Sequence, residues 1–318
     1  MASLAPPRSA GRRSPVPLFL AVVLAGWTTL GCLGGEAPSL TDGAGSDGVV
    51  AADLGVGELR TVDAWSASHE GRPTCKGTPL KVFDEKPGTL LQLAASLPTQ
   101  SGSAPFLIDT GSAWSFVFGT QNLSTELCCV SVSLPHVAGK VGWQLPDGTT
   151  PAGLLGSDLV SEGATLDLRI GENRLFWWRD PPEIPTAAAR VPLEYRPIGS
   201  MDAGLVASEI YLDGKKVRLM LDTGSPHVLI MSATPRPKEV EVHTFDGMGN
   251  PVTLYTSTIK ISFAGGPERV VAVDRAETFP VLEQTIVDLG GDVAGLLGLS
   301  ALGHQRIVLG RGLLAFLD

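Results

Sequence analysis

The sequence predicts an all-β protein built from two similar halves, and three observations lead to this prediction. Gly and Pro are abundant, with 38 and 24 residues, whereas long amphipathic helical patterns are scarce after residue 40. Short apolar runs bounded by turn residues recur along the chain, as expected for buried strands. Asp-Thr-Gly-Ser occurs twice, at 109–112 and 222–225, and Ala-Gly-Leu-Leu-Gly follows each copy, at 152–156 and 294–298. Internal duplication of this kind indicates a repeated architecture.

Each half repeats one order of predicted elements. A strand is followed by a second strand that ends in Asp-Thr-Gly-Ser, then by a third strand, by Ala-Gly-Leu-Leu-Gly and by a hairpin. The expected strands are 90–97, 106–108, 114–118, 165–170 and 175–178 in the first half, and 205–212, 219–221, 228–231, 306–309 and 313–317 in the second.

The two aspartates, Asp109 and Asp222, each lie where a buried strand is expected to break into a tight turn. Gly111 and Gly224 permit such a turn because glycine adopts backbone conformations that other residues avoid. An acidic side chain at the end of a buried strand is costly unless it is hydrogen-bonded or functional. Two unrelated turns are the alternative, but two accidental copies with the same apolar flanks are improbable at average residue usage.

With these motifs in place, residues 88–318 resemble the two-lobed aspartic peptidases of the pepsin and retropepsin superfamily. The compact halves look closer to bacterial retropepsin-like proteins than to pepsin. The resemblance implies two pseudo-twofold-related acid-protease lobes, each like a closed β-barrel, with the active site between them. We expect an N-terminal lobe at 88–178, a Pro-rich interlobe linker at 179–197 and a C-terminal lobe at 198–318.

The resemblance implies that Asp109 and Asp222 are the catalytic pair. Two carboxylates a few ångströms apart do not both ionise easily, because each negative charge raises the pKa of the other. The aspartic-protease dyad is the standard example of a pair that shares a proton in this way. One carboxylate would take a proton from water while the other protonates the peptide carbonyl. No metal, cofactor or covalent intermediate is expected.

The resemblance also gives roles to the residues that follow the two aspartates, and ordinary turn chemistry is compatible with those roles. The threonines are expected to brace the turns against each other, and the glycines to let backbone N–H groups approach the carboxylates. The serines are expected to hydrogen-bond the outer carboxylate oxygens. These active-site turn residues are Thr110, Gly111 and Ser112, and Thr223, Gly224 and Ser225.

A flap that closes over the substrate is the other working part of the family. Pepsin-like enzymes carry the flap on the first lobe. Here the segment between Asp-Thr-Gly-Ser and Ala-Gly-Leu-Leu-Gly is shorter in the first half than in the second, so 139–143 or 146–148 would supply only a stub of a flap. The second half offers a hairpin tip at 245–251, and we expect the flap there. The candidate flap residues are Gly247, Met248 and Gly249.

The N-terminus has the pattern of a targeting segment at 1–32, with a basic region and an apolar region too short for a confident membrane span. Thr-Leu-Gly-Cys, ending at Cys32, resembles a bacterial lipobox in which the Cys is lipidated. An ordinary secretory signal and an uncleaved anchor are the alternatives, and all three place the body outside the cytoplasm. Residues 33–57 are expected to be a flexible tether. Residues 58–87 form an N-terminal extension, either an extra hairpin or a short pro-segment.

The four cysteines predict a disulfide in an oxidising envelope. With Cys32 lipidated, Cys75 would pair with Cys128 or Cys129 and tie the extension to the first lobe, or the last two would form a vicinal bridge. The five histidines are scattered without metal-ligand spacing. His227 lies near the second tetrapeptide, where a cleft-facing position and a solvent-exposed one both remain open, and we favour exposure.

The formal net charge of −9 argues against nucleic acid or anionic lipid as the main partner. The predicted function is that of an aspartic endopeptidase of the cell envelope (periplasmic, lipid-anchored at the outer membrane, or secreted), acting as a monomer on protein or peptide substrates. Its membrane contact would be limited to the N-terminal lipid or signal anchor. The alternative is a non-catalytic or single-client peptide-binding envelope protein on the same fold.

Overall fold

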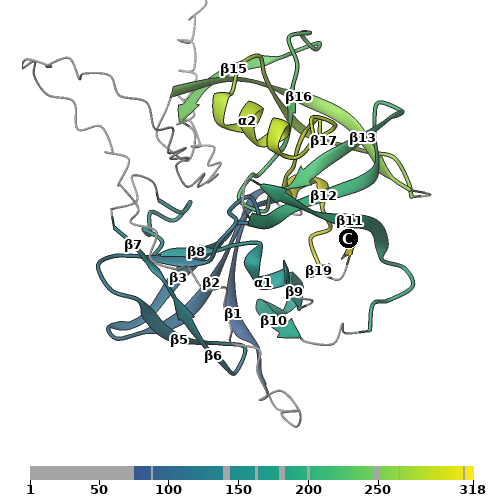
Figure 1. Ribbon diagram of the computed structural model, residues 1–318. Helices are drawn as coiled ribbons and strands as arrows, with labels where there is room; N and C mark the ends of the chain where they lie inside the picture. The colour runs from purple at the N-terminus through teal and green to yellow at the C-terminus, as the bar shows by residue number, and fades with distance from the viewer. Residues whose placement is uncertain are drawn as a thin grey trace, which may run out of the picture.

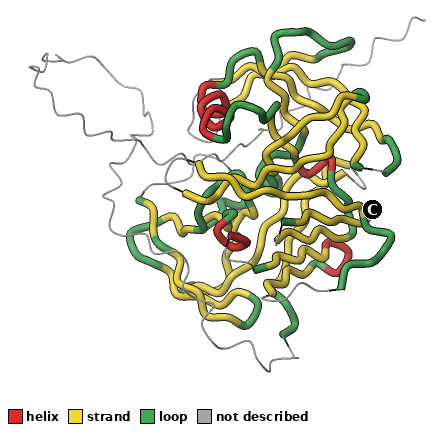
Figure 2. The backbone as a smooth tube through the Cα atoms, turned by 45° about the vertical axis from the view of Figure 1, so that its right-hand side comes forward, coloured by secondary structure: helices red, strands yellow, loops and turns green. Residues whose placement is uncertain are grey.

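The chain folds into an all-β protein, as the sequence predicted, and strands make up most of it (Figure 1). The computed structural model describes residues 75–86, 89–138, 144–161, 164–178, 183–198, 201–245, 251–264, 266–310 and 312–318. Helices are short and few among these residues, and strands follow one another through both halves (Figure 2). Within the described ranges, no helix has the length and apolar character needed to cross a membrane.

The first half contains ten strands and one short α-helix, all within the described residues. They are β1 (Thr78–Lys86), β2 (Thr89–Thr99), β3 (Gly102–Ile108), β4 (Phe116–Phe118), β5 (Leu123–Leu127), β6 (Val130–Leu134), β7 (His136–Val137), β8 (Gly153–Leu155), α1 (Asp158–Ser161), β9 (Thr165–Arg169) and β10 (Arg174–Trp178), with a 3₁₀ turn η2 (Ile170–Glu172) before β10.

The second half is built in the same way from β11 onward, and its described residues include one longer helix. Its elements are β11 (Ala189–Ile198), β12 (Met201–Leu212), β13 (Lys215–Leu221), β14 (Val228–Met231), β15 (Val240–Phe245), β16 (Pro251–Phe263), β17 (Arg269–Ala276), α2 (Pro280–Asp288), β18 (Gly295–Leu297), the 3₁₀ turn η3 (Leu299–Ala301), β19 (Arg306–Gly310) and β20 (Leu313–Leu317).

Strand pairing shows that the two halves are related by a pseudo-twofold. In the first half β3 pairs with β2 on one side and runs parallel to β8 on the other, and β4 pairs antiparallel with β8. In the second half β13, β12, β18 and β14 repeat all three pairings. The registers also match, because Ile108 lies beside Leu155 and Leu221 lies beside Leu297. Each Asp-Thr-Gly-Ser therefore leaves its half at the same point.

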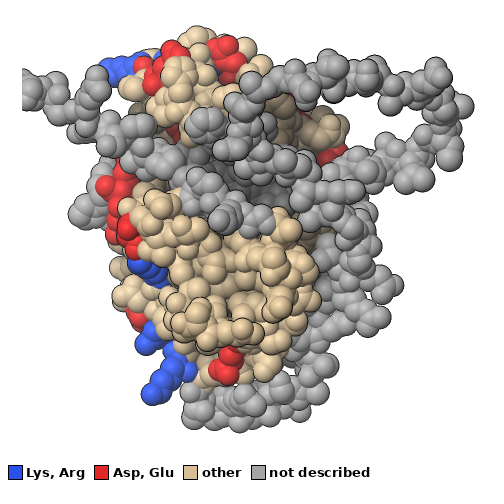
Figure 3. Space-filling view, turned by 90° about the vertical axis from the view of Figure 1, so that its left-hand side faces the viewer, with Lys and Arg blue, Asp and Glu red and all other residues tan. Residues whose placement is uncertain are grey.

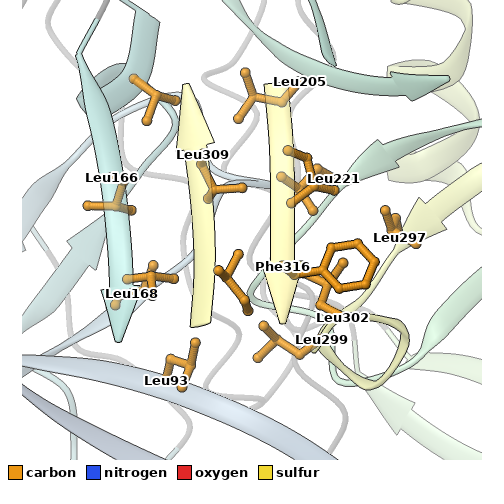
Figure 4. Packing of buried hydrophobic residues seen from close by; sticks show 14 of the residues in the cluster. Leu93, Leu166, Leu168, Leu205, Leu221, Leu297, Leu299, Leu302, Leu309 and Phe316 are labelled. Atoms are coloured by element: carbon orange, nitrogen blue, oxygen red, sulfur yellow. The ribbon is translucent and has the colours of Figure 1, made fainter. Parts of the chain in front are cut away.

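A shared sheet joins the two halves beneath these turns. Its antiparallel order is β10, β9, β19, β20 and β11, so two strands of the first half lie beside three strands of the second. Apolar side chains from this sheet and from the strands that precede the turns form one continuous buried cluster (Figure 4). The labelled residues include Leu166 and Leu168 on β9, Leu309 on β19, Phe316 on β20, Leu205 on β12 and Leu221 on β13. Because the halves share one core, their turns are held on a common base.

Two segments bear on the expected domain boundaries. Residues 78–86 were expected in an N-terminal extension, either an extra hairpin or a pro-segment, and they form β1, which pairs antiparallel with β2 from Leu80 onward as the hairpin alternative predicts. Residues 189–198 were expected to be linker, but they form β11, which pairs with β12 and β20. Val191 and Leu193 are buried on one face of β11, so its hydrophobic burial outweighs the two prolines of this strand. The prolines obscured the alternation of apolar and polar residues by which a strand is predicted from sequence.

The cysteines form one of the pairings that the sequence left open, a disulfide between Cys75 and Cys129. The bridge ties the start of β1 to the tight turn between β5 and β6. Cys128 and Cys129 have φ angles of 51° and 65°, so the turn has the left-handed backbone of a type I′ hairpin. Cys128 is a free thiol, and burial raises its pKa to about 11. The turn thus directs one cysteine inward and the other to Cys75.

Candidate active site

Asp109 and Asp222 lie at the centre of the molecule, where β3 and β13 end, and both are completely buried with 0% exposure. Their backbone N–H groups donate to equivalent carbonyls of the neighbouring strand, to that of Leu155 for Asp109 (2.9 Å) and to that of Leu297 for Asp222 (3.1 Å). These strands carry the Ala-Gly-Leu-Leu-Gly motifs. In each half, Ala-Gly-Leu-Leu-Gly therefore fixes the backbone of Asp-Thr-Gly-Ser.

The two turns are braced against each other by their threonines, as the sequence led us to expect. The Thr110 hydroxyl donates to the carbonyl of Leu221 (3.1 Å) and accepts from the Thr223 N–H (3.0 Å). The Thr223 hydroxyl donates to the carbonyl of Ile108 (2.9 Å) and accepts from the Thr110 N–H (3.0 Å). All four bonds cross between the halves and are buried, so they hold the turns at a set separation.

The two glycines place the carboxyl groups against the opposite turns. The N–H of Gly111 donates to Asp109 Oδ1 (3.0 Å) and that of Gly224 donates to Asp222 Oδ1 (2.9 Å). A Cβ atom added to Gly111 would lie 2.7 Å from Cγ of Asp222, and one added to Gly224 would lie 2.6 Å from Cγ of Asp109. Each glycine therefore touches the carboxyl group of the other half, and a larger residue would displace that group.

The serines differ from their expected role. Their hydroxyls do not bond the outer carboxylate oxygens; that of Ser112 donates to the carbonyl of Trp114 (2.9 Å), and that of Ser225 donates to the carbonyl of His227 (3.0 Å). A short hydroxyl side chain commonly bonds the backbone of its own turn, and that local chemistry prevails here. The serines support the carboxylates through their backbone N–H groups, which donate to the inner Oδ1 atoms at 3.2 Å in both halves.

The outer oxygens, Oδ2 of Asp109 and Oδ2 of Asp222, are buried and receive no N–H or O–H donor from other side chains or the backbone in the described part of the chain. Their inner Oδ1 atoms each accept two backbone N–H bonds. Each carboxyl group is thus fixed through one oxygen, while the other oxygen is left for a shared proton or a bound molecule.

The pKa values of the pair are raised and separated. Burial raises the pKa of Asp109 well above its ordinary value, and the negative charge of Asp222 and a hydrogen bond with it raise it further. Burial also raises the pKa of Asp222, and the hydrogen bond from Asp109 and nearby backbone N–H groups limit the rise to about 6. The pair therefore holds a single proton over a wide pH range, and the two groups titrate as a unit.

His227, at the start of β14, is largely buried with 14% of its side chain exposed, so the expectation of a solvent-exposed histidine was wrong. Its Nδ1 lies 2.9 Å from Oδ2 of Asp274 on β17, and its Nε2 lies 3.8 Å from Oε2 of Glu85 on β1. Burial alone would lower the pKa of His227, but the two carboxylates raise it above the ordinary value. The imidazole therefore lies between a carboxylate of each half, Glu85 in the first and Asp274 in the second.

The partly buried carboxyl group of Asp158 escaped the sequence analysis. It lies at the start of α1 and accepts a hydrogen bond from the Ser115 hydroxyl at 2.7 Å. The available signal was a difference between the two repeats, because Asp158 and Ser300 occupy the same position after Ala-Gly-Leu-Leu-Gly. Among the described residues, no group of three or more His, Cys, Asp or Glu side chains is placed to hold a metal ion.

The flap predictions fall partly outside the described residues. β15 and β16 pair antiparallel and form the arms of the expected hairpin. Its tip, with Gly247, Met248 and Gly249, lies outside the described residues, as do 139–143 and Cys32. The segment 146–148 forms a tight turn closed by a hydrogen bond from the Gly148 N–H to the Leu145 carbonyl (2.8 Å). On the face drawn in Figure 3, the lower part of the view shows a broad uncharged surface, with charged side chains along its left edge and at its lower end.

Comparisons with known proteins give little further information. No protein-family model matches the chain, and no curated protein matches it. Among solved structures, basic 7S globulin from soybean is similar with 11% sequence identity and a TM-score of 0.41, over 76% of this chain and 94% of the globulin chain. A similarity at this level carries no information about function.

Proposed function

We propose that the chain is an aspartic-type endopeptidase that hydrolyses peptide bonds between its two halves. The observation that carries this proposal is the geometry of the pair: Asp109 and Asp222 come from equivalent turns, and each carboxyl group lies against the glycine of the other turn. Their raised pKa values leave one proton on the pair near neutral and mildly acidic pH. One acid and one base side by side are the groups that water-mediated amide hydrolysis requires.

The proposed mechanism uses the single proton that the pair holds, and the two roles belong to the pair rather than to one named aspartate. The ionised carboxylate takes a proton from a water molecule between the two carboxyl groups, and the water oxygen attacks the peptide carbonyl carbon. The protonated carboxyl group gives its proton to the carbonyl oxygen, which yields a tetrahedral diol. In the collapse, the first group gives the proton that it took to the leaving amine nitrogen, the second regains one from a diol hydroxyl, and the C–N bond breaks.

The hydrogen bonds around the pair support this mechanism. The inner oxygens are held by the N–H groups of both turns, so the carboxyl groups need little reorganisation during the reaction. The outer oxygens are buried without such donors. A buried acceptor without a donor costs about 1–3 kcal/mol, and a substrate-derived or water-derived donor would relieve that cost.

The proposal places the body outside the cytoplasm, where the Cys75–Cys129 disulfide is stable. Lipid attachment at Cys32 and the action of a monomer remain predictions of the sequence. Both aspartates belong to one chain, which supports activity without a second copy. Protein or peptide substrates follow from the proposed reaction.

Cleavage of a diverse peptide library by the full chain, from about pH 3 to about pH 8, tests the proposal. The matched variants are Asp222→Asn, which removes one carboxyl group of the pair, and Asp213→Asn, which changes an exposed carboxylate paired with Arg236. We expect the unmodified chain and Asp213→Asn to cleave the same peptides and Asp222→Asn to cleave none. Equal cleavage by all three proteins would refute the assignment.

Peptide binding without turnover is a second candidate, and one observation favours it: both carboxyl groups are completely buried in this structure. A substrate reaches them only if the surrounding segments open. This candidate predicts that a library peptide binds the folded chain and is recovered intact at every pH tested. The same library distinguishes the two functions, because binding and cleavage are measured on the same peptides.

A further inference from the structure

The two turns are equivalent in their own hydrogen bonds, but the segments directly behind them differ. In the first half, Ser115 donates to Asp158 twice, from its hydroxyl to Oδ1 (2.7 Å) and from its N–H to Oδ2 (3.0 Å). In the second half, the corresponding positions are Val228 and Ser300. Val228 is buried and apolar, and the Ser300 hydroxyl is buried without a hydrogen-bond partner among the described residues. A hydrogen-bonded Ser–Asp pair in the first half thus stands where the second half has none among its described residues.

The backbone contacts behind the second turn show what is sufficient to hold such a turn. There, the N–H of Leu299 donates to the carbonyl of Ser225 (2.9 Å), and the N–H of Ser300 donates to that of Pro226 (2.8 Å). These two bonds join η3 to the turn, and neither of them involves a side chain. An ionisable side chain is therefore not needed to build the fold at this position.

The first half adds side-chain bonds that lead from Asp158 to the catalytic carboxyl group. The N–H of Gly156 donates to the Ser115 hydroxyl (2.9 Å). Ser157 donates to the carbonyl of Ser112 from its N–H (2.9 Å) and from its hydroxyl (3.2 Å). The N–H of Ser112 in turn donates to Oδ1 of Asp109 (3.2 Å). Together with the backbone of residues 156–157 and of Ser112, these bonds connect Asp158 to Asp109.

Asp158 is itself on a firmly held segment. The indole N–H of Trp177 on β10 donates to the carbonyl of Leu159 (2.6 Å), and the Tyr195 hydroxyl on β11 donates to the carbonyl of Val160 (2.9 Å). Both strands belong to the sheet shared by the two halves. Movement at Asp158 is therefore resisted by the common base of the molecule.

We propose that Ser115 and Asp158 are a positioning pair for Asp109: they fix the backbone of the first turn from behind, so that its N–H groups hold the Asp109 carboxyl group in place. The pair makes no contact with the substrate in this proposal and acts through the turn. The role rests on the proposed peptidase function, and it gives the two aspartates different supports.

The electrostatics of Asp158 distinguish this role from plain structural support. Burial raises the pKa of Asp158 to about 6, although Ser115 and the backbone N–H groups of Asp158 and Leu159 all lower it. The folded pKa lies above the ordinary value of 3.8, so this group stabilises the fold least above about pH 6, where it is ionised. A neutral residue of the same shape would be at least as good for stability. A carboxylate at this position therefore fits a positioning role better than a role in stability.

The test compares three variants of the full chain: Asp158→Asn, Ser115→Val, which introduces the residue found at the second half's equivalent position, and Ser300→Ala as the matched control from that half. The values of kcat and KM are measured on a peptide from the cleavage screen, and Tm is measured in parallel. We expect Asp158→Asn and Ser115→Val to lower kcat about tenfold with KM within about twofold, because small displacements of a catalytic group reduce the rate. Ser300→Ala should change neither constant.

Tm separates positioning from unfolding. For Asp158→Asn near pH 7, Tm should equal or exceed that of the unmodified chain, and Ser115→Thr should restore the kcat lost in Ser115→Val. An unchanged kcat in Asp158→Asn would overturn the proposal, as would a loss of kcat that follows a loss of Tm. If Ser115→Val does not fold, Ser115→Ala removes the hydroxyl without adding bulk and takes its place in the same comparison.

A second measurement keeps this inference separate from the peptidase proposal. If the unmodified chain cleaves no peptide, the carboxyl carbons of Asp109 and Asp222 are titrated by NMR in the unmodified chain, in Asp158→Asn and in Ser300→Ala. A displaced turn changes the N–H bonds to Asp109, so its apparent pKa should shift in Asp158→Asn by about half a unit or more and remain unchanged in Ser300→Ala. Identical titrations in all three proteins would overturn the positioning role.

Discussion

Replacing Thr110 by Val tests whether the cross-bracing of the two turns stabilises the whole molecule. The side chain is fully buried, and the substitution keeps its shape while a methyl group replaces the hydroxyl. The carbonyl of Leu221 loses its donor, and the N–H of Thr223 loses its acceptor. Each buried group left unsatisfied costs about 1–3 kcal/mol, so the predicted loss is about 2–6 kcal/mol. That is a large part of the about 5–15 kcal/mol that stabilises an ordinary domain.

Thr110→Ser is the matched control, because it keeps both hydrogen bonds and removes one methyl group, at a cost of about 0.8 kcal/mol. Urea unfolding of both variants, followed by tryptophan fluorescence, is measured in the Asp222→Asn background so that self-cleavage does not remove the unfolded chain. We expect one transition, since both halves share a sheet and a core. A Val variant no less stable than the Ser variant would refute the argument that the bracing bonds hold the halves together.

Three further predictions follow from the geometry of the site. Gly111→Ala and Gly224→Ala should each reduce kcat about a hundredfold or more, because the added Cβ would lie within 2.7 Å of Cγ of the opposite aspartate. An unchanged kcat in the folded variants would contradict this. The folded-state pKa of Asp222, about 6, lies above its ordinary value of 3.8, so its contribution to stability is fully present below about pH 4 and is lost as pH rises through about 6. The urea midpoint should therefore depend less on pH over this range in Asp222→Asn than in the unmodified chain. A variant whose midpoint follows the same pH profile as the unmodified chain would contradict this. The pKa of His227 measured by NMR should lie above 6.5, and Glu85→Gln should lower it. The stability that the protonated imidazole provides is present below about pH 6.5 and disappears as pH rises through the folded-state pKa. An unchanged titration of His227 in Glu85→Gln would show that the contact between the halves is absent.

The all-β fold, the twofold repetition and the strands that lead into the two turns could be predicted from the sequence. These features depend on short segments whose meaning is local: apolar runs, a turn-forming glycine, and a motif that occurs twice. Asp109 and Asp222 were found for the same reason, because each lies inside a duplicated tetrapeptide. The bracing by Thr110 and Thr223 followed from the resemblance that those tetrapeptides carry.

Only the tertiary structure decided which groups meet around those turns. Asp274, which meets His227, comes from a strand far along the chain. Ser115 likewise meets Asp158 only because β4 and β8 pair before α1 begins. A local pattern determines whether a segment becomes a strand or a turn, but the partner of a buried polar side chain depends on which distant segments pack against it. That packing arises from the burial of the core as a whole, and no single stretch of sequence specifies it.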